Sequence, residues 1–471
     1  MTTATITKSK NIFCRLSCKK ISAHVNLSAV SKVFANLKNP SIIGANSARK
    51  NNARFSYWVA NPLEIFEFNY RQKQPFIKLQ KTLNKYILEN NTTHTLPKGI
   101  FTGGWIGFFS YDLGRYIENI PDNVTDDLKM PLIRLCFYDK LIAYDHHKDR
   151  FWLIVLEHGN DNETVQQKFS CLENLLAIAS EINPMLPPAG DLENIDFSNI
   201  KCNMDKDYYL TAIKKIKKYI LDGDVYQINF SQRFQCDYNS NPIELFNWQN
   251  HYNPSEYSAY IDSGTFQIVS ASPEMFITIK DRNISTKPIK GTRPRTGKEA
   301  LDYQNYNELL NSLKEQAELN MIVDLERNDL ARICIPGTRK VIQPRTIETY
   351  PTIFHAVATV AGKLRADISF CDILKAMFPG GSITGAPKVS SMEIIDETEP
   401  TARGVYTGSI GLIGLDGNIS LNIAIRTIIT KDNKAYTQTG GGIVADSDPQ
   451  DEWNKTITKA RALLAGIIAT K

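Results

Sequence analysis

The order of strand-like and helix-like segments constrains the fold of this chain more than any other feature. Helical patterns at residues 208–221 and 300–332 lie among strand-like runs at 266–270, 275–279, 408–415 and 419–429. No βαβ unit repeats along the chain, which disfavours a doubly wound parallel sheet. The order therefore predicts a mixed α+β fold with mainly antiparallel sheets.

A proline-rich segment at residues 183–190 divides the sequence into two regions. Its three prolines fix φ and remove backbone donors, so no regular element continues through it. Upstream, we predict strands at 132–144 and 150–157 with a turn between them, and a helix at 165–181. We therefore predict an N-terminal region, residues 1–190, and a C-terminal region, residues 191–471.

Composition limits the partners and the compartment. The 55 basic and 50 acidic residues leave a net charge of +5, too small to indicate nucleic acid or membrane binding. The eight cysteines are scattered, which predicts neither a disulfide framework nor a zinc site. No apolar run approaches the ~20 residues of a membrane span, and no secretory h-region is visible. The cytoplasm is the expected compartment.

One basic segment can carry a nucleophile. In PIKGTRPR, residues 288–295, Lys290 lies beside Gly291 and is followed by Arg293 and Arg295. Nearby cations would disfavour the ammonium, lower the pKa of Lys290 and leave an amine able to attack an electrophile. A basic surface loop is the alternative interpretation.

A glycine-rich segment and a pair of glutamates suggest an anion site and a cation site. FPGGSITGAPK, residues 378–388, predicts a loop that enters a helix with Pro387 in its first turn, where free amides can hold an anion. Glu315 and Glu318 are three apart in a predicted helix and share one face, where Mg²⁺ would take their oxygens. An ordinary turn and solvated carboxylates are the alternatives.

The motif GGGIVADSDP, residues 440–449, lies near the end of the chain. It predicts a flexible loop, a short strand and then a helix capped by Asp448 with Pro449 at its first position. Glu452 falls in the first turn of this helix, where the helix dipole alone favours a carboxylate.

These motifs together resemble the chorismate-utilising enzymes, which include the anthranilate, aminodeoxychorismate, isochorismate and salicylate synthases. The resemblance runs through about residues 205–464 and rests on PIKGTRPR, MIVDLERNDLARI, FPGGSITGAPK and GGGIVADSDP in family order. GWIGFFSYDLGR and GDVYQIN, upstream, resemble the aminodeoxychorismate branch. The resemblance implies a sandwich of two mainly antiparallel sheets flanked by helices. It also implies that the N-terminal region is woven into the same body as the chorismate-binding region.

The resemblance also implies catalytic roles. Lys290 stands where the anthranilate enzymes have alanine, which points to the branch that makes 4-amino-4-deoxychorismate for 4-aminobenzoate and folate synthesis. By resemblance, Lys290 attacks C2 of chorismate and Glu274 protonates the departing C4 hydroxyl; ammonia then enters at C4 and expels the lysine. His355 matches the family's active-site histidine, a proton carrier; without the family it is a core histidine.

Further positions match the family's substrate site. Tyr406, Arg426 and the backbone around Gly442 would hold the substrate carboxylates, with the arginine pairing bidentately. Gly291 and Thr292 would line the same cavity. Lys388 would either add positive charge or order its loop.

The resemblance implies Mg²⁺ as a cofactor, held by Glu318, Glu315 and Glu452. The family usually has a second glutamate three residues after Glu452 as a direct ligand, but this chain has Lys455 there. A lysine ammonium has no lone pair and repels Mg²⁺ at short range. We expect metal binding that is retained but altered; a weakened or lost site is the alternative, and Lys455 can simply be a partner for Glu452.

The expected small molecules are chorismate and ammonia. No glutaminase segment is visible, so the resemblance implies a separate glutamine amidotransferase subunit, and a lyase acting on the product. The alternatives are an anthranilate synthase component, which Lys290 disfavours, and a non-catalytic chorismate-binding regulatory subunit, which Lys455 suggests but Lys290, Glu274 and His355 together oppose. An isochorismate or salicylate synthase would need water in place of ammonia.

Overall fold

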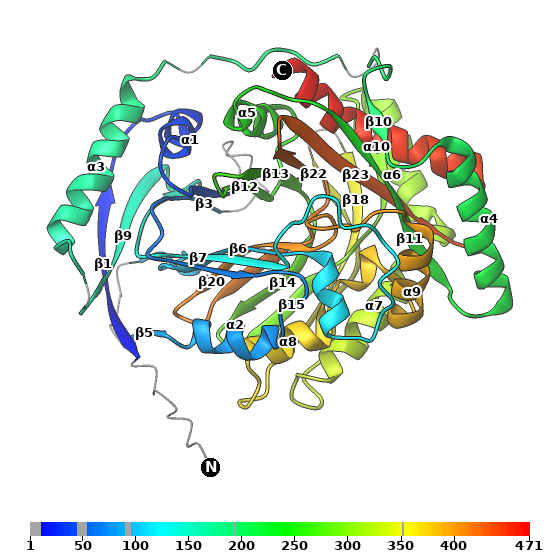
Figure 1. Cartoon of the computed structure of the whole chain (residues 1–471), viewed down its shortest axis with the longest axis horizontal. Coiled ribbons are helices and arrows are strands. Elements are labelled where there is room, and N and C mark those ends of the chain that lie inside the picture. The colour runs from blue at the N-terminus through cyan, green and yellow to red at the C-terminus, as the bar shows by residue number, and fades with distance from the viewer. Residues whose placement is uncertain are drawn as a thin grey trace.

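The structure, a computed structural model, describes residues 11–44, 54–89, 96–159, 161–183, 185–191, 195–350 and 353–471. Within these ranges two β-sheets lie against each other, and helices cover their outer faces (Figure 1). Among the named strands, every pair is antiparallel except β1 (Ile12–Ile21) with β5 (Tyr86–Leu88). The predicted α+β sandwich is confirmed.

Each sheet takes strands from both sides of residue 190. The larger sheet has the spatial order β10 (Lys201–Cys202), β11 (Gln227–Asp237), β23 (Lys434–Ile443), β22 (Thr427–Lys431), β13 (Phe266–Ser272), β12 (Tyr257–Asp262), β2 (Ser41–Ile43), β3 (Phe55–Val59), β8 (Lys140–Asp145), β9 (Arg150–His158), β1 and β5, with β19 (Gly385–Ala386) paired to β11. The smaller sheet has the order β16 (Ile289–Pro294), β18 (Ile353–Lys363), β15 (Asn283–Lys287), β14 (Met275–Lys280), β21 (Ile419–Asn422), β20 (Ser409–Gly414), β6 (Gly104–Phe109), β7 (Ile133–Tyr138) and β4 (Glu64–Phe68), with β17 (Lys340–Thr349) paired to β18. The N-terminal region is thus woven into the same body, while a division near residue 190 stays a prediction.

The helices pack on the outer faces of both sheets. The larger sheet is covered by α1 (Leu27–Ala35), α3 (Val165–Glu181), α4 (Lys206–Asp222), α5 (Pro242–Tyr252) and α10 (Pro449–Ala469). The others are α2 (Pro75–Leu83), α6 (Glu299–Asn311), α7 (Leu313–Ala331), α8 (Phe370–Met377) and α9 (Lys388–Thr398), with the short 3₁₀ turns η1 (Tyr111–Tyr116) and η2 (Gly381–Ile383). Of these, α2, α7 and α8 pack against the smaller sheet.

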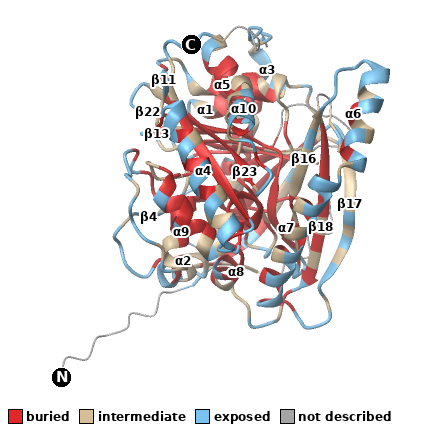
Figure 2. Ribbon diagram, turned by 90° about the vertical axis from the view of Figure 1, so that its right-hand side faces the viewer, coloured by how far each residue is buried: buried red, intermediate tan, exposed pale blue. Residues whose placement is uncertain are grey.

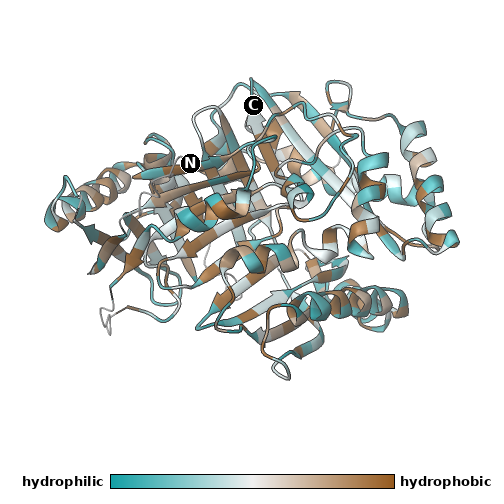
Figure 3. Ribbon diagram, turned by 60° about the horizontal axis from the view of Figure 1, so that its bottom comes forward, coloured by the Kyte–Doolittle hydropathy of each residue, from teal (hydrophilic) through white to brown (hydrophobic). Residues whose placement is uncertain are grey.

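Apolar side chains hold the two sheets together. Leu16 and Leu156 of the larger sheet belong to one cluster with Trp105, Phe137 and Ile277 of the smaller. Each such side chain contributes about 1.5–3 kcal/mol when fully buried. The central strands are accordingly buried, whereas the helices keep exposed faces (Figure 2), and many helices show one hydrophobic and one hydrophilic side (Figure 3).

Three predicted segments are each split in two. The predicted strand at 132–144 is β7 and β8, which separate at Asp139 and join different sheets. The predicted helix at 300–332 is α6 and α7, because the Ser312 side chain accepts a hydrogen bond from the Glu315 amide and caps the second helix. The strand-like run at 419–429 is β21 and β22. Periodicity continues across such breaks, so the sequence pattern did not reveal them.

The glycines of GGGIVADSDP are not a flexible loop, as predicted, but part of β23. Glycine is required there by close packing: a Cβ on Gly440 would lie 2.7 Å from the Phe230 carbonyl oxygen, and one on Gly442 would lie 2.9 Å from Nε2 of Gln227. The helix that follows agrees with the prediction, since Asp448 caps α10 and Pro449 is its first residue. Close contact across the sheet, not flexibility, explains this motif.

The predictions about cysteines and membrane spans can be compared with the described residues. None of the eight cysteines forms a disulfide in the structure, in agreement with the prediction. Within the described ranges, no helix has the length and apolarity needed to cross a bilayer. The one group of carboxylate and histidine atoms close enough for a metal is Asp139, His158 and Asp161, but Nζ of Lys168 lies 2.5 Å from Asp139 and 2.6 Å from Asp161. An ammonium of the chain thus neutralises that group.

Candidate active site

A bulge in β16 positions Lys290. The register between β16 and β18 shifts between Ile289 and Thr292, and Gly291, inside the shift, has φ +93°, a conformation that favours glycine. A Cβ on Gly291 would also lie 2.7 Å from Leu309 and 3.1 Å from the Glu315 carboxyl carbon. With the strand bent in this way, Nζ of Lys290 donates to the carbonyl of Ser382 in the glycine-rich segment, at 3.1 Å.

The pKa of Lys290 is lowered, as predicted, but for a different reason. Burial disfavours its ammonium, and the carboxylates of Glu318 and Glu274 oppose this by raising the pKa. The arginines of the motif are engaged elsewhere: Arg293 pairs with Glu315 at 2.8 Å and Arg295 donates to a carbonyl. The free amine is thus favoured by desolvation, not by neighbouring cations.

Glu274 lies between β13 and β14, beside Lys290. It is 4% exposed, and burial raises the pKa of its carboxyl group, although Ser382 and Lys290 favour the carboxylate. The amide of Ile289 donates to Glu274 Oε1 at 3.4 Å. The structure therefore brings a buried carboxyl group, disposed to keep its proton, next to a buried amine disposed to lose one.

His355 lies on β18 opposite Thr292. Its Nδ1 is 2.8 Å from the Thr292 hydroxyl, and its Nε2 is buried without a hydrogen-bond partner among the described residues. Burial, and then the charge of Arg426, lower the pKa of His355 to about 3. The imidazole is therefore neutral near pH 7, and any proton that it donates comes from a ring N–H.

Arg426 is a cation without a matching anion. It has φ +49°, and within the described residues its guanidinium makes no hydrogen bond or ion pair. Burial lowers its pKa, and Tyr350 is the neighbour that opposes this. A half-buried guanidinium without an anionic partner is suited to binding a carboxylate ligand.

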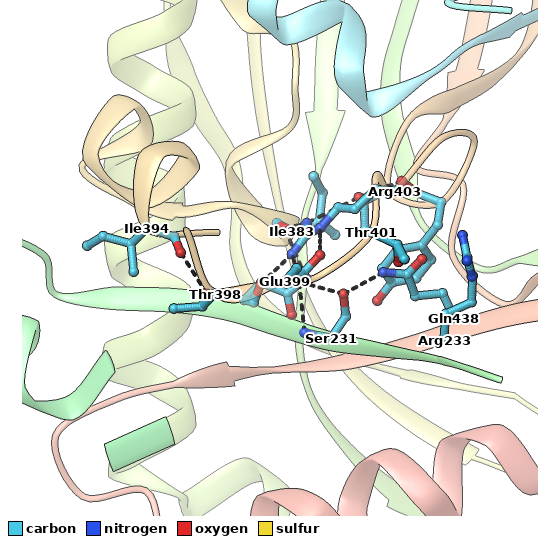
Figure 4. Close-up of polar contacts among 12 residues, drawn as sticks. Ser231, Arg233, Ile383, Ile394, Thr398, Glu399, Thr401, Arg403 and Gln438 are labelled. Carbon is cyan, nitrogen blue, oxygen red and sulfur yellow. Dashed lines mark hydrogen bonds and ion pairs between the residues drawn. The ribbon is translucent and has the colours of Figure 1, made fainter. Parts of the chain in front are cut away.

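Tyr406 lies beside the ion pair formed by Arg403 and Glu399. The two side chains form a bidentate pair at 2.7 and 2.9 Å, and Arg403 also donates to the carbonyls of Ile383 and Asn229 (Figure 4). The guanidinium lies 5.8 Å from the centre of the Tyr406 ring. The predicted tyrosine, the loop at 378–388 and β11 are thereby fixed to one another.

Lys388 does not point into the group of predicted substrate residues. Its Nζ lies 2.6 Å from the carboxylate of Asp329 and 2.9 Å from the carbonyl of Met377. Burial and Asp329 raise the pKa of Glu326 to about 8, and Glu326 accepts from the Gly381 amide. These contacts favour the loop-ordering alternative for Lys388 over contact with substrate. Pro387 is the cap residue of α9, one position before the first turn in which it was predicted.

The three predicted metal ligands lie near one another but do not form a closed site. Glu315 and Glu318 project from α7 and Glu452 from α10; the pKa of Glu318 is raised mainly by burial and further by both other glutamates. Oε2 of Glu315 is buried without a partner, so its chemistry suits a hard cation. Glu452, however, accepts from Lys455 at 2.8 Å and from Ser447 at 3.1 Å. Glu315 and Glu318 fit Mg²⁺ as oxygen donors, whereas Glu452 is already engaged.

Two residues at this site were missed in the sequence. Lys459 lies seven residues after Glu452 on α10 and donates to the Gly440 carbonyl at 2.8 Å; burial and Lys290 lower its pKa to about 8. The spacing of residues 452, 455 and 459 places all three on one helix face and could have revealed it. Gln227 is fully buried beside Gly442, and both its amide atoms lack a partner in the described residues. No local pattern marks this glutamine.

Comparison with known proteins places the chain in a family. The profile described as "chorismate binding enzyme" matches residues 44–465. The chain is 40% identical over 376 residues to aminodeoxychorismate synthase component 1 of Bacillus subtilis (strain 168), covering 80% of this chain and 79% of that protein. It is 39% identical over 436 residues to anthranilate synthase component 1 of Acetivibrio thermocellus, covering 88% and 87%. The crystal structure of anthranilate synthase component I from Streptococcus pneumoniae TIGR4 matches with a TM-score of 0.76 at 29% identity, covering 88% of this chain and 93% of that chain. This chain therefore belongs to the family of chorismate binding enzymes.

Proposed function

We propose that the chain is component I of aminodeoxychorismate synthase, which converts chorismate and ammonia to 4-amino-4-deoxychorismate for 4-aminobenzoate and folate synthesis. One arrangement carries the proposal: the half-buried Lys290 lies beside the buried carboxyl group of Glu274, which accepts from the Ile289 amide, and burial favours the neutral form of both. A neutral amine can attack carbon and a neutral carboxyl group can protonate a leaving hydroxyl. The similarity to the Bacillus subtilis protein supports the same choice.

In the first proposed step, Lys290 acts as the nucleophile. Its lone pair forms a bond to C2 of chorismate, the ring double bonds shift, and the C4–O bond breaks. Glu274 gives its proton to the departing oxygen, which leaves as water. The Lys290 adduct and the Glu274 carboxylate remain.

In the second proposed step, ammonia forms a bond to C4, the double bonds shift back, and the C2–N bond breaks to release Lys290. The Glu274 carboxylate would accept a proton lost by the incoming nitrogen. The uncompensated guanidinium of Arg426 would bind one substrate carboxylate, with Tyr406 and the Gly442 backbone beside it. His355 would carry protons through a neutral ring, with Thr292 fixing its orientation.

Magnesium is proposed to bind at Glu318 and Glu315. Glu315 Oε2 has no partner in the described chain and Glu318 makes no hydrogen bond there, so both have oxygen lone pairs free for a cation. Bound there, Mg²⁺ would neutralise a carboxylate of chorismate. Every proton transfer proposed above is made by side chains of the chain.

Ammonia is proposed to come from a separate glutamine amidotransferase subunit, with free ammonium as its substitute in vitro. An aminodeoxychorismate lyase would then act on the product to give 4-aminobenzoate.

The test is product analysis with purified protein. The chain is incubated with chorismate, ammonium, Mg²⁺ and aminodeoxychorismate lyase, and 4-aminobenzoate and anthranilate are separated by chromatography and identified by mass. We expect 4-aminobenzoate, and a loss of at least about 10³-fold in Lys290→Ala, since removal of a nucleophile has effects of that order. Lys298→Ala, which changes an exposed lysine, is the matched control.

Each other result would select a different function. Anthranilate as the main product would identify an anthranilate synthase component. No product from folded protein that still binds chorismate would support the regulatory alternative. Equal activity in Lys290→Ala would remove lysine from the mechanism.

A further inference from the structure

Each carboxylate of the glutamate group already faces a cation of the chain. Arg293 pairs with Glu315 at 2.8 Å, and Lys455 pairs with Glu452 at 2.8 Å. Lys290 lies close enough to Glu318 to lower the pKa of that carboxyl group. Glu315 and Glu452 are therefore each paired with a cation of the chain before any metal ion binds.

Lys455 belongs to this group and is not an isolated surface residue. Its ammonium holds Oε1 of Glu452, a residue only 3% exposed, and its positive charge contributes to the lowered pKa of Lys459. The Lys455 side chain is 56% exposed, so two of its three N–H donors remain free for a ligand. Lys455 thus combines a fixed anchor on Glu452 with access for a charged ligand.

We propose that Lys455 is a tethered cation which takes part of the role of a divalent ion: it removes Glu452 from the metal site and binds a carboxylate of chorismate directly. This inference rests on the proposed use of chorismate but not on which product is formed. The site at Glu315 and Glu318 then binds metal weakly, because a dication must approach the Lys455 ammonium and Glu452 is not available as a ligand. Chorismate binds without magnesium.

A comparable arrangement exists elsewhere in the chain. The ammonium of Lys168 lies between Asp139 and Asp161, which with His158 form a group, within the described residues, whose ligand atoms are close enough together for a metal. In both places a lysine supplies, by a covalent tether, the charge that an ion would bring. A lysine ammonium is present whether or not metal ions are in solution. It binds anions as a single point charge and not through a coordination shell.

The test measures binding without turnover, in the Lys290→Ala background and without ammonia. Chorismate affinity is measured by calorimetry in EDTA and in excess Mg²⁺, and Mn²⁺ affinity is measured from the electron paramagnetic resonance signal of the free ion. We expect chorismate affinity to be nearly equal in the two conditions, and Mn²⁺ binding to be weak.

Two variants at one position separate charge from coordination. Lys455→Glu should tighten Mn²⁺ binding by at least about tenfold, the usual size of the change in metal affinity when a group around the metal is altered. It should also make chorismate binding depend on Mg²⁺. Lys455→Gln removes the cation without adding a ligand, so it should weaken chorismate binding in EDTA and tighten Mn²⁺ binding less than Lys455→Glu. Circular dichroism melting confirms that each variant is folded.

The proposal is overturned if the protein with Lys455 loses chorismate in EDTA, or if Lys455→Glu and its parent bind Mn²⁺ equally. Failure of the proposed function would appear differently. The product assay would then yield anthranilate or nothing, while these binding results could still be obtained.

Discussion

The two sides of the candidate site are charged in opposite ways. On one side Lys290 is the proposed nucleophile and Glu274 the proposed proton donor, and burial moves both towards their neutral forms. On the other side Glu315 and Glu452 are paired with cations, and Glu318 lies near both of them. A neutral amine can attack a substrate and a neutral carboxyl group can protonate it. Charged side chains instead bind ions and carboxylates.

The elements that carry each side explain the difference. Lys290 and Glu274 come from strands and their ends, and Lys290 reaches the loop at 378–388 through the Ser382 carbonyl. The glutamates project from α7 and α10, on the outer layer, where long cationic side chains can reach them. The proposed reactive groups thus come from strands, and the charged glutamates come from helices.

The largest expected effect tests the reactive side. Glu274→Gln keeps the shape of the side chain but cannot donate a proton, so kcat with ammonium should fall about 10²–10⁴-fold, as for loss of a general acid. Because Glu274 must be protonated and Lys290 neutral, the rate of the parent should decline both above the pKa of the first group and below that of the second. Initial rates of 4-aminobenzoate formation across pH measure this. A variant that retains the parent's rate would show that Glu274 is not the acid.

The sequence was most informative where function is local. Lys290 was predicted from its motif and Glu274 and His355 from the family resemblance; the structure brings the first two together and places His355 on β18, opposite Thr292 of β16. It was least informative about burial: the lowered pKa of Lys290 was attributed to arginines that in fact pair with other groups. Desolvation depends on residues distant in the sequence, such as Ser382, which lies 92 positions after Lys290, and no local sequence window contains them.

The fold shows the same limit. The mixed order of segments correctly predicts antiparallel sheets. The triple glycine at 440–442, however, predicts a flexible loop where the structure has a strand. Its role in β23 depends on Phe230 and Gln227, more than 200 residues earlier. Non-local strand pairing decides such positions.

A smaller effect tests the charge-balanced side. Glu318→Gln removes a carboxylate that makes no hydrogen bond in the described chain, so the weak Mn²⁺ affinity should fall by about tenfold or more. Glu452→Gln is the matched control, because Glu452 is already engaged by Lys455 and should matter less. Mn²⁺ titration followed by electron paramagnetic resonance gives both affinities. A larger loss in Glu452→Gln would mean that Lys455 does not keep this carboxylate from the metal.

The smallest effect concerns stability on the reactive side. The folded pKa of His355 is about 3, below the ordinary value near 6.5, so between these values only the unfolded state binds the proton. The free energy of unfolding should therefore fall as the pH falls, by about 1.4 kcal/mol per pH unit from this residue, or about 2 kcal/mol between pH 7 and pH 5. Urea unfolding of the parent and of His355→Gln at both pH values isolates the contribution as a difference. Parallel losses in the two proteins would show that folding does not lower the pKa of His355, and the burial argument for a neutral ring would then be wrong.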